Sequence, residues 1–441
     1  MSKKHPVLIG TFILTATGFI SRFIGFFFRM FLSHTFGEEQ VGLYQLIFPI
    51  YALCFSLTCA GIETAISRCV ANKISLKKEK ESLHILYTGI TISVILSLIL
   101  LLVVQTHASE FSIYILGDIR CEAMLIAISY ALPFAAIHSC ICGYYFGLKQ
   151  TEIPASSQLV EQLVRVLSVY FIYQIALNHN GQIHILFAVF GIVIGEFCSA
   201  LFCILSLSRQ TQNLLQNFRF SSFLRLTNEL LTLSIPLTSS RVLLNILQSI
   251  ESISIPIRLQ YFGYTNSEAL SNYGVLTGMA LPCIFFPTAI SNSLSTMLLP
   301  TVAEIQTQKN YPHLRNLIGK VIFYCVSLGS LCCLCFFILS HWIGNILFHS
   351  ELAGNYLKTL AWLCPFLYLN STLISITNGL GKSNITFLIN TIGLGIRITG
   401  VLIFIPLIGM NGYLWGLLLS QCLTSLLTLS YLFYYLKKIA S

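Results

Sequence analysis

The chain has 441 residues, of which 55% are hydrophobic and only 9% are charged, whereas an average soluble domain has about 25% charged residues. So few charges cannot cover a water-exposed surface, and the mean hydropathy of +0.79 agrees with this. The composition therefore excludes a soluble enzyme, a DNA-binding module or a secreted disulfide scaffold as the whole chain. It indicates an integral membrane protein.

Long apolar runs alternate with short polar breaks along the whole chain. A spanning helix needs about 20 apolar residues, so the runs predict an all-α polytopic membrane protein of about 12 transmembrane helices in two six-helix lobes. We expect the first span to be retained, because no small-residue cleavage site follows it. The expected spans are 7–32, 42–67, 83–106, 121–148, 154–178, 183–207, 228–254, 271–300, 316–340, 354–379, 384–406 and 411–435.

The chain is expected to divide into an N-terminal lobe (1–207), a cytoplasmic linker (208–227) and a C-terminal lobe (228–441). The linker is polar and basic, and we expect it to lie flexibly or as an amphipathic segment at the inner surface. Its Phe218, Phe220 and Phe223 would then face lipid.

The net charge of +9 has to be placed relative to the membrane before it is interpreted. With the N-terminus in the cytoplasm, only Arg120, Arg258 and Lys358 fall in outside loops. This excess of basic residues on the inside predicts that both termini are cytoplasmic. The net positive charge is therefore explained by topology, and we do not expect nucleic-acid binding. Seventeen basic residues fall in inside segments, namely Lys3, Lys4, Arg68, Lys73, Lys77, Lys78, Lys80, Lys149, Arg209, Arg219, Arg225, Lys309, Arg315, Lys320, Lys382, Lys437 and Lys438.

Nine charged residues fall within or at the edges of the spans. A charge at mid-bilayer costs about 2.5–3.5 kcal/mol on insertion scales, so such residues usually face a partner or a water-filled cavity. They are the first candidates for a functional site, with snorkelling or packing as the alternative for those near a boundary, Arg29, Glu63 and Glu196. The nine are Arg22, Arg29, Arg165, Arg241, Arg397, Glu63, Glu161, Glu196 and Glu251.

Polar residues follow one face of two expected helices. In the first helix the stripe runs from Thr11 through Arg22 to Arg29, and in the seventh it runs from Ser234 through Arg241, Asn245 and Gln248 to Ser252. The stripes lie 223 residues apart and suggest a duplicated six-helix unit. Close helix packing explains the small residues equally well, but it explains Arg22 and Arg241 poorly. We therefore expect both arginines to line a solvated cavity between the lobes.

The fifth expected helix carries Glu161 and Arg165, which are four residues apart and therefore share a face. The two side chains can pair within the helix. Such a pair serves either the structure or a transport path.

The fifteen cysteines lie almost entirely in apolar spans, where cysteine behaves as a small hydrophobic residue. Of ten histidines only His138 lies in the middle of a span, so we expect no metal site. A nucleotide-binding phosphate loop is also missing from the sequence, so we expect no cofactor and no ATP hydrolysis.

Several sequence runs, taken in order, resemble the stage V sporulation protein B group of the multidrug/oligosaccharidyl-lipid/polysaccharide (MOP) exporter superfamily. The runs are GFISRFIGF from Gly18, GLYQLIFPIY from Gly42, GIETAISR from Gly61, GLKQ from Gly147, EQLVR from Glu161, SIPL from Ser234, PIRL from Pro256, YG from Tyr273 with LP at Leu299, and NGLGK from Asn378. They span nearly the whole chain. Many members of the group carry two further C-terminal helices, which we do not expect here.

The resemblance implies a two-lobed bundle that is not an enzyme. Such a bundle flips a polyprenyl-pyrophosphate-linked oligosaccharide or peptidoglycan precursor across the cytoplasmic membrane by alternating access, with spore cortex synthesis as an implied setting. Arg22 matches a substrate-binding arginine of related lipid II flippases, and Arg29 lies one residue beyond a second. We expect a monomer whose partners are the lipid-linked sugar, membrane lipids and envelope-synthesis enzymes.

Residue chemistry gives the expected substrate site and an alternative function. Arginine binds pyrophosphate bidentately, so Arg22, Arg29, Arg165 and Arg241 are candidates for substrate binding, with Asn245 and Gln248 for sugar. The alternative is a cation-coupled multidrug exporter of the same superfamily. Glu63, Glu161 and Glu251 are candidates for ion coupling in either case, and five intramembrane arginines against four glutamates favour an anionic substrate.

Overall fold

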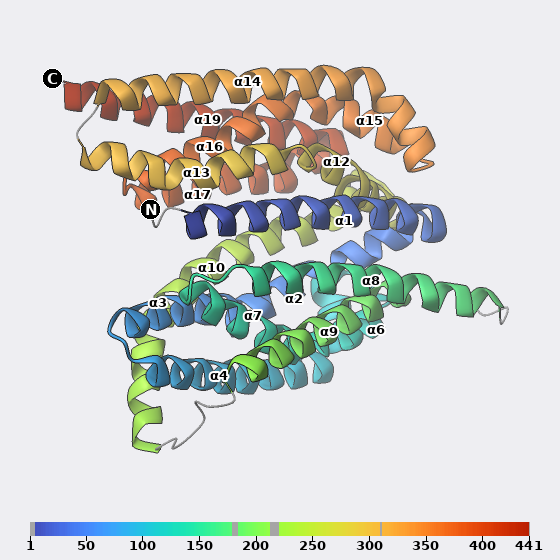
Figure 1. Ribbon diagram of the computed structural model, residues 1–441. Helices are drawn as coiled ribbons and strands as arrows, with labels where there is room; N and C mark the ends of the chain where they lie inside the picture. The colour runs from blue at the N-terminus through green and yellow to red at the C-terminus, as the bar shows by residue number, and fades with distance from the viewer. Residues whose placement is uncertain (1–4, 179–183, 212–219, 309–310, 441) are drawn as a thin grey trace. The chain divides into compact units, whose positions relative to one another are not determined.

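The computed structural model describes residues 5–178, 184–211, 220–308 and 311–440 (Figure 1). Every regular element among these residues is a helix, and the described part contains no β-strand. A helix pairs its backbone N–H and C=O groups with one another, and lipid offers these groups no hydrogen-bond partner. The predicted all-α polytopic membrane fold is therefore confirmed.

Nine helical stretches in the described part are long and apolar enough to cross a membrane, and up to eleven if each of two bent pairs is counted as one span. Ten of the expected spans each coincide with one of these stretches. The remaining two, 7–32 and 42–67, fall together in one stretch of 64 residues, Phe12–Ser75. Within it the helical backbone is interrupted at Gly37 (φ 79°, ψ 172°).

The chain forms two compact units whose boundaries fall inside two long helices. Unit 1 consists of Met1–Phe28 and Leu43–Ile253, and unit 2 consists of Arg29–Gly42 and Ser254–Ser441. Residues 212–219 of the expected linker lie outside the described residues, and so do the side chains of its phenylalanines. The division into 1–207, 208–227 and 228–441 stays a prediction.

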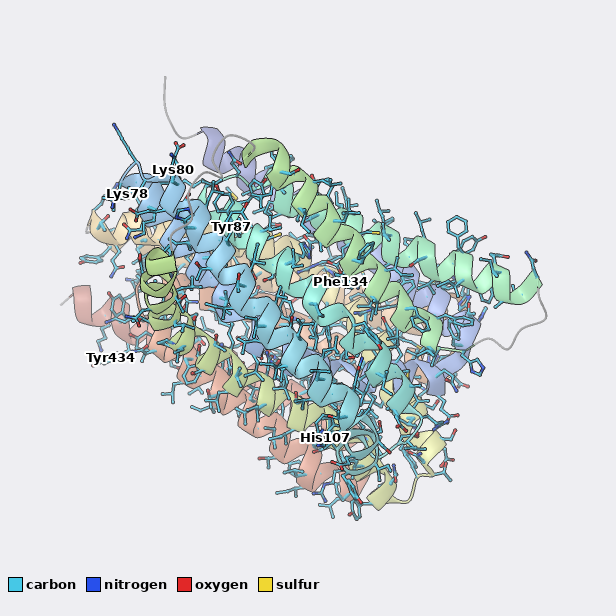
Figure 2. All side chains as sticks on the ribbon, turned by 90° about the horizontal axis from the view of Figure 1, so that it is seen from below. Lys78, Lys80, Tyr87, His107, Phe134 and Tyr434 are labelled. Carbon is cyan, nitrogen blue, oxygen red and sulfur yellow. The ribbon has the colours of Figure 1, made fainter. Side chains whose placement is uncertain are left out.

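Unit 1 is built around α7, which packs against α3, α4 and α9, while α8 runs beside α9 (Figure 1). An edge-to-face contact of Phe134 with Phe197, 5.2 Å between ring centres, joins α7 to α9 (Figure 2). The helices from the N-terminus are α1 (His5–Leu46), α2 (Phe48–Phe55), the π-helix η1 (Ser56–Ala60), α3 (Gly61–Ser75), α4 (Glu79–Thr106), α5 (Ala108–Glu110), the π-helix η2 (Phe111–Leu116), α6 (Cys121–Ser129), α7 (Ala131–Gly147), α8 (Glu152–Asn178), α9 (Leu186–Thr211) and α10 (Phe220–Phe262).

Unit 2 has the same plan, because α16 packs against α13, α14 and α19, while α17 runs beside α19. Its apolar core includes Val302, Ile305, Cys325, Leu373 and Ile376. The helices are α11 (Asn266–Gly274), the π-helix η3 (Val275–Ala280), α12 (Leu281–Phe285), α13 (Thr288–Thr307), α14 (Tyr311–Trp342), the π-helix η4 (Ile343–Leu347), α15 (Glu351–Leu360), the 3-10 helix η5 (Ala361–Leu363), α16 (Cys364–Gly379), α17 (Ser383–Thr399), the π-helix η6 (Gly400–Phe404), α18 (Ile405–Ile408) and α19 (Met410–Ala440).

The turns that end α7 and α16 repeat one another bond for bond. After α7 the amide groups of residues 148, 149 and 150 donate to the carbonyl groups of 144, 146 and 145; after α16 those of 380, 381 and 382 donate to 376, 378 and 377. All of these positions differ by 232. Lys149 and Gly381 adopt the same left-handed conformation, with φ of 61° and 71°.

Gly147 and Gly379 show the same repeat in the packing. A Cβ atom at Gly147 would lie 2.8 Å from the carbonyl oxygen of Ser67 and one at Gly379 would lie 2.8 Å from that of Leu299, so each glycine allows close helix approach. Ser67 and Leu299 are also 232 positions apart. The predicted duplication of a parallel unit is present, but its register in these helices is 232 and not the 223 of the polar stripes.

The last helices of the two units correspond with a shorter offset. Gly195 in α9 lies against the carbonyl oxygen of Glu161, and Ser420 in α19 donates to the carbonyl oxygen of Gly393 at 2.8 Å. Glu161 and Gly393 keep the 232-residue register, whereas Gly195 and Ser420 differ by 225. The connection between α17 and α19 is therefore seven residues shorter than the connection between α8 and α9. With the offset of 225, Glu196 corresponds to Gln421.

Candidate functional site

Unit 1 contains a cavity of about 270 Å³ that is lined by both apolar and ionisable side chains. Three carboxylates and one imidazole reach it from α3, α7, α8 and α9. Such a concentration of titratable groups inside a membrane bundle marks a candidate functional site. The polar residues of the lining are Glu63, His138, Ser139, Cys142, Gln158, Glu161 and Glu196.

His138 lies at the centre of the polar lining, and both ring nitrogens have a partner. Nδ1 lies 3.3 Å from Oε2 of Glu196, and Nε2 lies 3.0 Å from Oγ of Ser157. The imidazole therefore connects α7 to α8 and to α9. Both side chains of the His138–Glu196 pair are largely buried, 15% and 11% exposed, so the pair is poorly screened by water.

The other two carboxylates of the cavity are held separately. Arg165 donates to Glu161 within α8, as the four-residue spacing predicts. Ser139 donates to Oε2 of Glu63 at 3.0 Å. The oxygen and nitrogen ligand atoms of His138, Glu161 and Glu196 lie within 4.8 Å of one another. This arrangement can exchange a proton or hold a cation.

The equivalent place in unit 2 has neutral residues where unit 1 has its carboxylates and its imidazole, and it keeps an arginine, because Arg397 corresponds to Arg165. Asn370, which corresponds to His138, donates from Nδ2 to Oε1 of Gln421 at 2.6 Å and to Oγ1 of Thr424 at 2.9 Å. Ser425 donates to Oδ1 of Asn370 at 2.8 Å. Glu63 corresponds to Ser295 and Glu161 to Gly393. The same scaffold thus carries amides, hydroxyls and a glycine in unit 2 where unit 1 carries its carboxylates and its histidine.

Arg241 is held in place by the start of α3 and not by an acidic partner. Nη1 donates to the carbonyl oxygen of Ala60 at 2.8 Å, and Nη2 donates to Oγ1 of Thr64 at 3.0 Å. The side chain is exposed, and it interacts electrostatically with Glu63. It belongs to the stretch Leu226–Phe262, which is long and apolar enough to cross the membrane. An oriented guanidinium group with remaining N–H donors is suited to bind an anion.

The remaining predicted residues do not line this cavity. Asn245 is half-buried and Gln248 is exposed, both on α10, and Arg22 is exposed on α1. Glu251 is buried, 4% exposed. Arg29 belongs to unit 2. Of the substrate-binding and ion-coupling candidates, Glu63 and Glu161 line the cavity, and Arg165 adjoins it through its pair with Glu161.

Two cysteines and a serine beside His138 were not expected to belong to a site. His138, Cys142 and Cys203 place their nitrogen and sulfur atoms within 4.8 Å of one another, so His138 belongs to a cluster of possible ligand atoms that the sequence analysis did not predict. The signal lay in two helical spacings. His138 and Cys142 are four residues apart, Glu196 and Cys203 are seven apart, and each pair therefore shares a helix face.

Two family models match the sequence. Residues 7–306 match the model described as polysaccharide biosynthesis protein, and residues 223–403 match the MatE model. The chain is also 28% identical to stage V sporulation protein B of Bacillus subtilis (strain 168) over 430 residues, which cover 96% of this chain and 83% of that protein.

Solved structures share the fold. The lipid II flippase MurJ in an inward closed conformation superposes with a TM-score of 0.74 and 16% identity, covering 97% of this chain and 90% of that one. An inward-facing multidrug resistance MATE family transporter of the MOP superfamily superposes with a TM-score of 0.69 and 13% identity, covering 95% of each chain.

Proposed function

The chain belongs to the polysaccharide biosynthesis protein family, and from this premise we propose that it flips a polyprenyl-pyrophosphate-linked oligosaccharide or peptidoglycan precursor across the cytoplasmic membrane. It is a multi-pass membrane protein of the flippase or transporter class. Alternating access is the mechanism we propose, with spore cortex synthesis as the setting suggested by the similarity to the sporulation protein.

One observation carries the choice of an anionic lipid, and it is the arrangement of Arg241. Its guanidinium group is oriented by Ala60 and Thr64 while its face stays exposed. A charge in a spanning helix costs free energy unless it meets water, a partner or a ligand. A pyrophosphate supplies negative charge and several acceptor oxygens, which a guanidinium group matches bidentately.

Other side chains extend this proposal. We assign pyrophosphate contacts to Arg22 and Arg29 as well, and hydrogen bonds to the sugar to Asn245 and Gln248, which follow Arg241 along α10. Arg165 takes a different part, because its charge is already balanced by Glu161. We assign it to the coupling site and not to direct pyrophosphate binding.

We propose that the cavity in unit 1 couples transport to an ion gradient. Glu63, His138, Glu161 and Glu196 all line it. Loading it with a proton or a cation changes the charge balance among its carboxylates, His138 and the adjoining Arg165, which biases a two-state equilibrium. Glu251 is buried outside this lining and is a second candidate for the ion.

The proposed orientation has both termini in the cytoplasm. Figure 2 shows Lys78 and Lys80 at one end of α4 and His107 at its other end. A lysine-rich end is typical of the cytoplasmic side. We further propose that the protein acts as a monomer, with membrane lipids around it and envelope-synthesis enzymes as its partners.

A cation-coupled multidrug exporter is the second candidate function. The match of residues 223–403 to the MatE model favours it, and the acidic cavity suits cation exchange. The two candidate functions differ in the charge of the substrate. Arg241 would attract an anionic substrate and repel a cationic one.

Flipping by purified protein in liposomes separates the two. With a fluorescent polyprenyl-pyrophosphate saccharide we expect wild-type protein to flip the lipid and Arg241→Ala to lose flipping, while Arg241→Lys keeps part of it. Arg258→Ala is the matched control, because Arg258 stacks on Tyr261, 5.2 Å from the ring centre, far along α10. Equal flipping by Arg241→Ala and wild type would reject the proposed anion site.

A further inference from the structure

The side of the His138 ring that faces Ser157 carries a second cluster, and the proposed coupling does not use its two cysteines. Cys142 follows His138 by one turn of α7, and Cys203 reaches the same place from α9. The His138, Cys142 and Cys203 ligand atoms lie within 4.8 Å of one another. Ser157 Oγ lies 3.0 Å from His138 Nε2 and 3.6 Å from Cys142 Sγ.

One imidazole nitrogen and two thiols form a ligand set for zinc. Zn–S bonds of about 2.3 Å and Zn–N bonds of about 2.0 Å place the ligand atoms of a tetrahedral site about 3.5 to 3.8 Å apart. The three ligand atoms lie within 4.8 Å of one another, so their separations exceed this range by about 1 Å at most, which side-chain rotation can close. Ser157 Oγ or a water from the cavity is available as the fourth ligand.

The charge of such a site suits its surroundings. Zn²⁺ with two thiolates and a neutral imidazole has no net charge, so it avoids the cost of an uncompensated charge inside the bundle. Cys142 and Cys203 are 7% and 0% exposed. Their two thiol protons leave as the metal binds, and the cavity that Cys142 and His138 line gives a path for both the metal and the protons.

Glu196 completes the arrangement from the other side of the ring. Its Oε2 lies 3.3 Å from His138 Nδ1, which fixes the imidazole with Nε2 directed away from the carboxylate. A carboxylate on the distal nitrogen is a frequent outer partner of zinc-binding histidine.

Unit 2 shows that the scaffold does not need these side chains for packing. The positions that correspond to His138, Cys142 and Cys203 are Asn370, Ile374 and Thr428. Asn370 and Thr428 are both buried. The same helices therefore pack with a neutral set, and the two thiols are a property of unit 1 alone.

We propose that His138, Cys142 and Cys203 bind one Zn²⁺ ion in unit 1 and thereby join α7 to α9. Because the ion takes the imidazole that also contacts Glu196, bound zinc restrains the ring next to the coupling cavity. The inference does not depend on which substrate the protein moves.

Metal analysis and spectroscopy of the full-length protein test the site. Protein purified without a polyhistidine tag and incubated with Zn²⁺ is expected to retain one equivalent after desalting. Replacing Zn²⁺ by Co²⁺ in wild-type protein should produce a thiolate-to-cobalt charge-transfer band in the near ultraviolet. A wild-type protein without this band would overturn the proposal, whatever the variants do.

Variants then locate the site. Cys142→Ser with Cys203→Ser should abolish metal retention, and Glu196→Gln should weaken zinc binding by about 10- to 100-fold. Cys140→Ser is the matched control, because Cys140 is equally buried on α7 but donates to Ser93 at 3.3 Å. Undiminished zinc retention by the double variant would place the metal elsewhere and contradict the assignment.

Discussion

The polar centres of the two units occupy corresponding positions but differ in chemistry. In unit 1 His138 meets Glu196 across α7 and α9, and in unit 2 Asn370 meets Gln421 across α16 and α19. Hydrogen bonding is satisfied in both. Since amides and hydroxyls are sufficient to join the helices in unit 2, His138 and Glu196 of unit 1 are not required for packing.

The difference extends to a third buried position nearer the helix ends. Lys73 in α3 corresponds to Ile305 in α13, and each residue is 6% exposed. Lys73 pairs with Glu229 at 3.0 Å and with Glu81 at 3.2 Å, whereas Ile305 belongs to the apolar core of unit 2. Duplication has therefore preserved the backbone while charge has been kept, or gained, in one half. This contrast is why we assign ion coupling to unit 1.

The largest expected effect comes from making unit 1 resemble unit 2. The double variant His138→Asn with Glu196→Gln should stay folded, because Asn370 and Gln421 form the same contact on the same scaffold. Gradient-driven flipping should fall to the level of protein-free liposomes. Gln421→Glu is the matched control in unit 2 and should leave the ion dependence unchanged. Full gradient dependence in the double variant would show that the cavity does not couple transport.

Breaking the scaffold itself should affect both units alike. Gly147→Val and Gly379→Val each place a side chain against a backbone carbonyl oxygen at 2.8 Å, and overpacking of this kind costs about 1–3 kcal/mol. Thermal unfolding in detergent measures it. Gly395→Ala in α17 is the control, since a Cβ there meets no atom within 4 Å. A large loss in only one of the two valine variants would argue against the repeat.

A smaller effect is expected at the ion pair that unit 2 lacks. Glu229→Gln removes one of two acidic partners from Lys73, whose side chain is 8% exposed. Because Glu81 remains, the free energy of unfolding should fall by about 1 kcal/mol. Chemical denaturation of wild type and variant gives the difference. No change at all would mean that Glu81 alone is sufficient for the buried lysine.

The smallest effect is expected at the exposed neighbour of this pair. Lys78 contacts Glu81 at 2.9 Å, but its side chain is 49% exposed. Exposed pairs of this type contribute about 0–1 kcal/mol. Lys78→Ala should therefore change the unfolding free energy by less than Glu229→Gln does, and any change should shrink as salt is added. The opposite order would show that burial does not decide the strength of these pairs.

The long apolar runs were sufficient to predict the spans, because a lipid-exposed helix must be apolar over its full length. Ten spans were located this way, and the helical pair of Glu161 and Arg165 followed from its spacing. The break at Gly37 and the unit boundaries inside α1 and α10 could not be predicted, because they depend on contacts between distant segments. The expected linker remains a prediction, since residues 212–219 lie outside the described ranges.

The site was harder to predict than the fold. Intramembrane charge identified Glu63, Glu161 and Glu196 as candidates, because a buried carboxylate is costly wherever it lies. His138 and Cys203 come together only after α7 and α9 pack, so no single run of sequence contains the cluster. The 232-residue register was not predicted, because it is carried by packed glycines and by the turns after α7 and α16. The 223-residue offset between the polar stripes of α1 and α10 stays a prediction.

Flipping by wild-type protein in liposomes, with an imposed proton or sodium gradient and no nucleotide, tests the central claim most directly. The liposomes contain a fluorescent polyprenyl-pyrophosphate saccharide, and a fluorescent organic cation is assayed in parallel. We predict that the gradient accelerates flipping of the lipid and that the organic cation is not transported. Transport of the cation without the lipid, or flipping that needs ATP, would contradict the account.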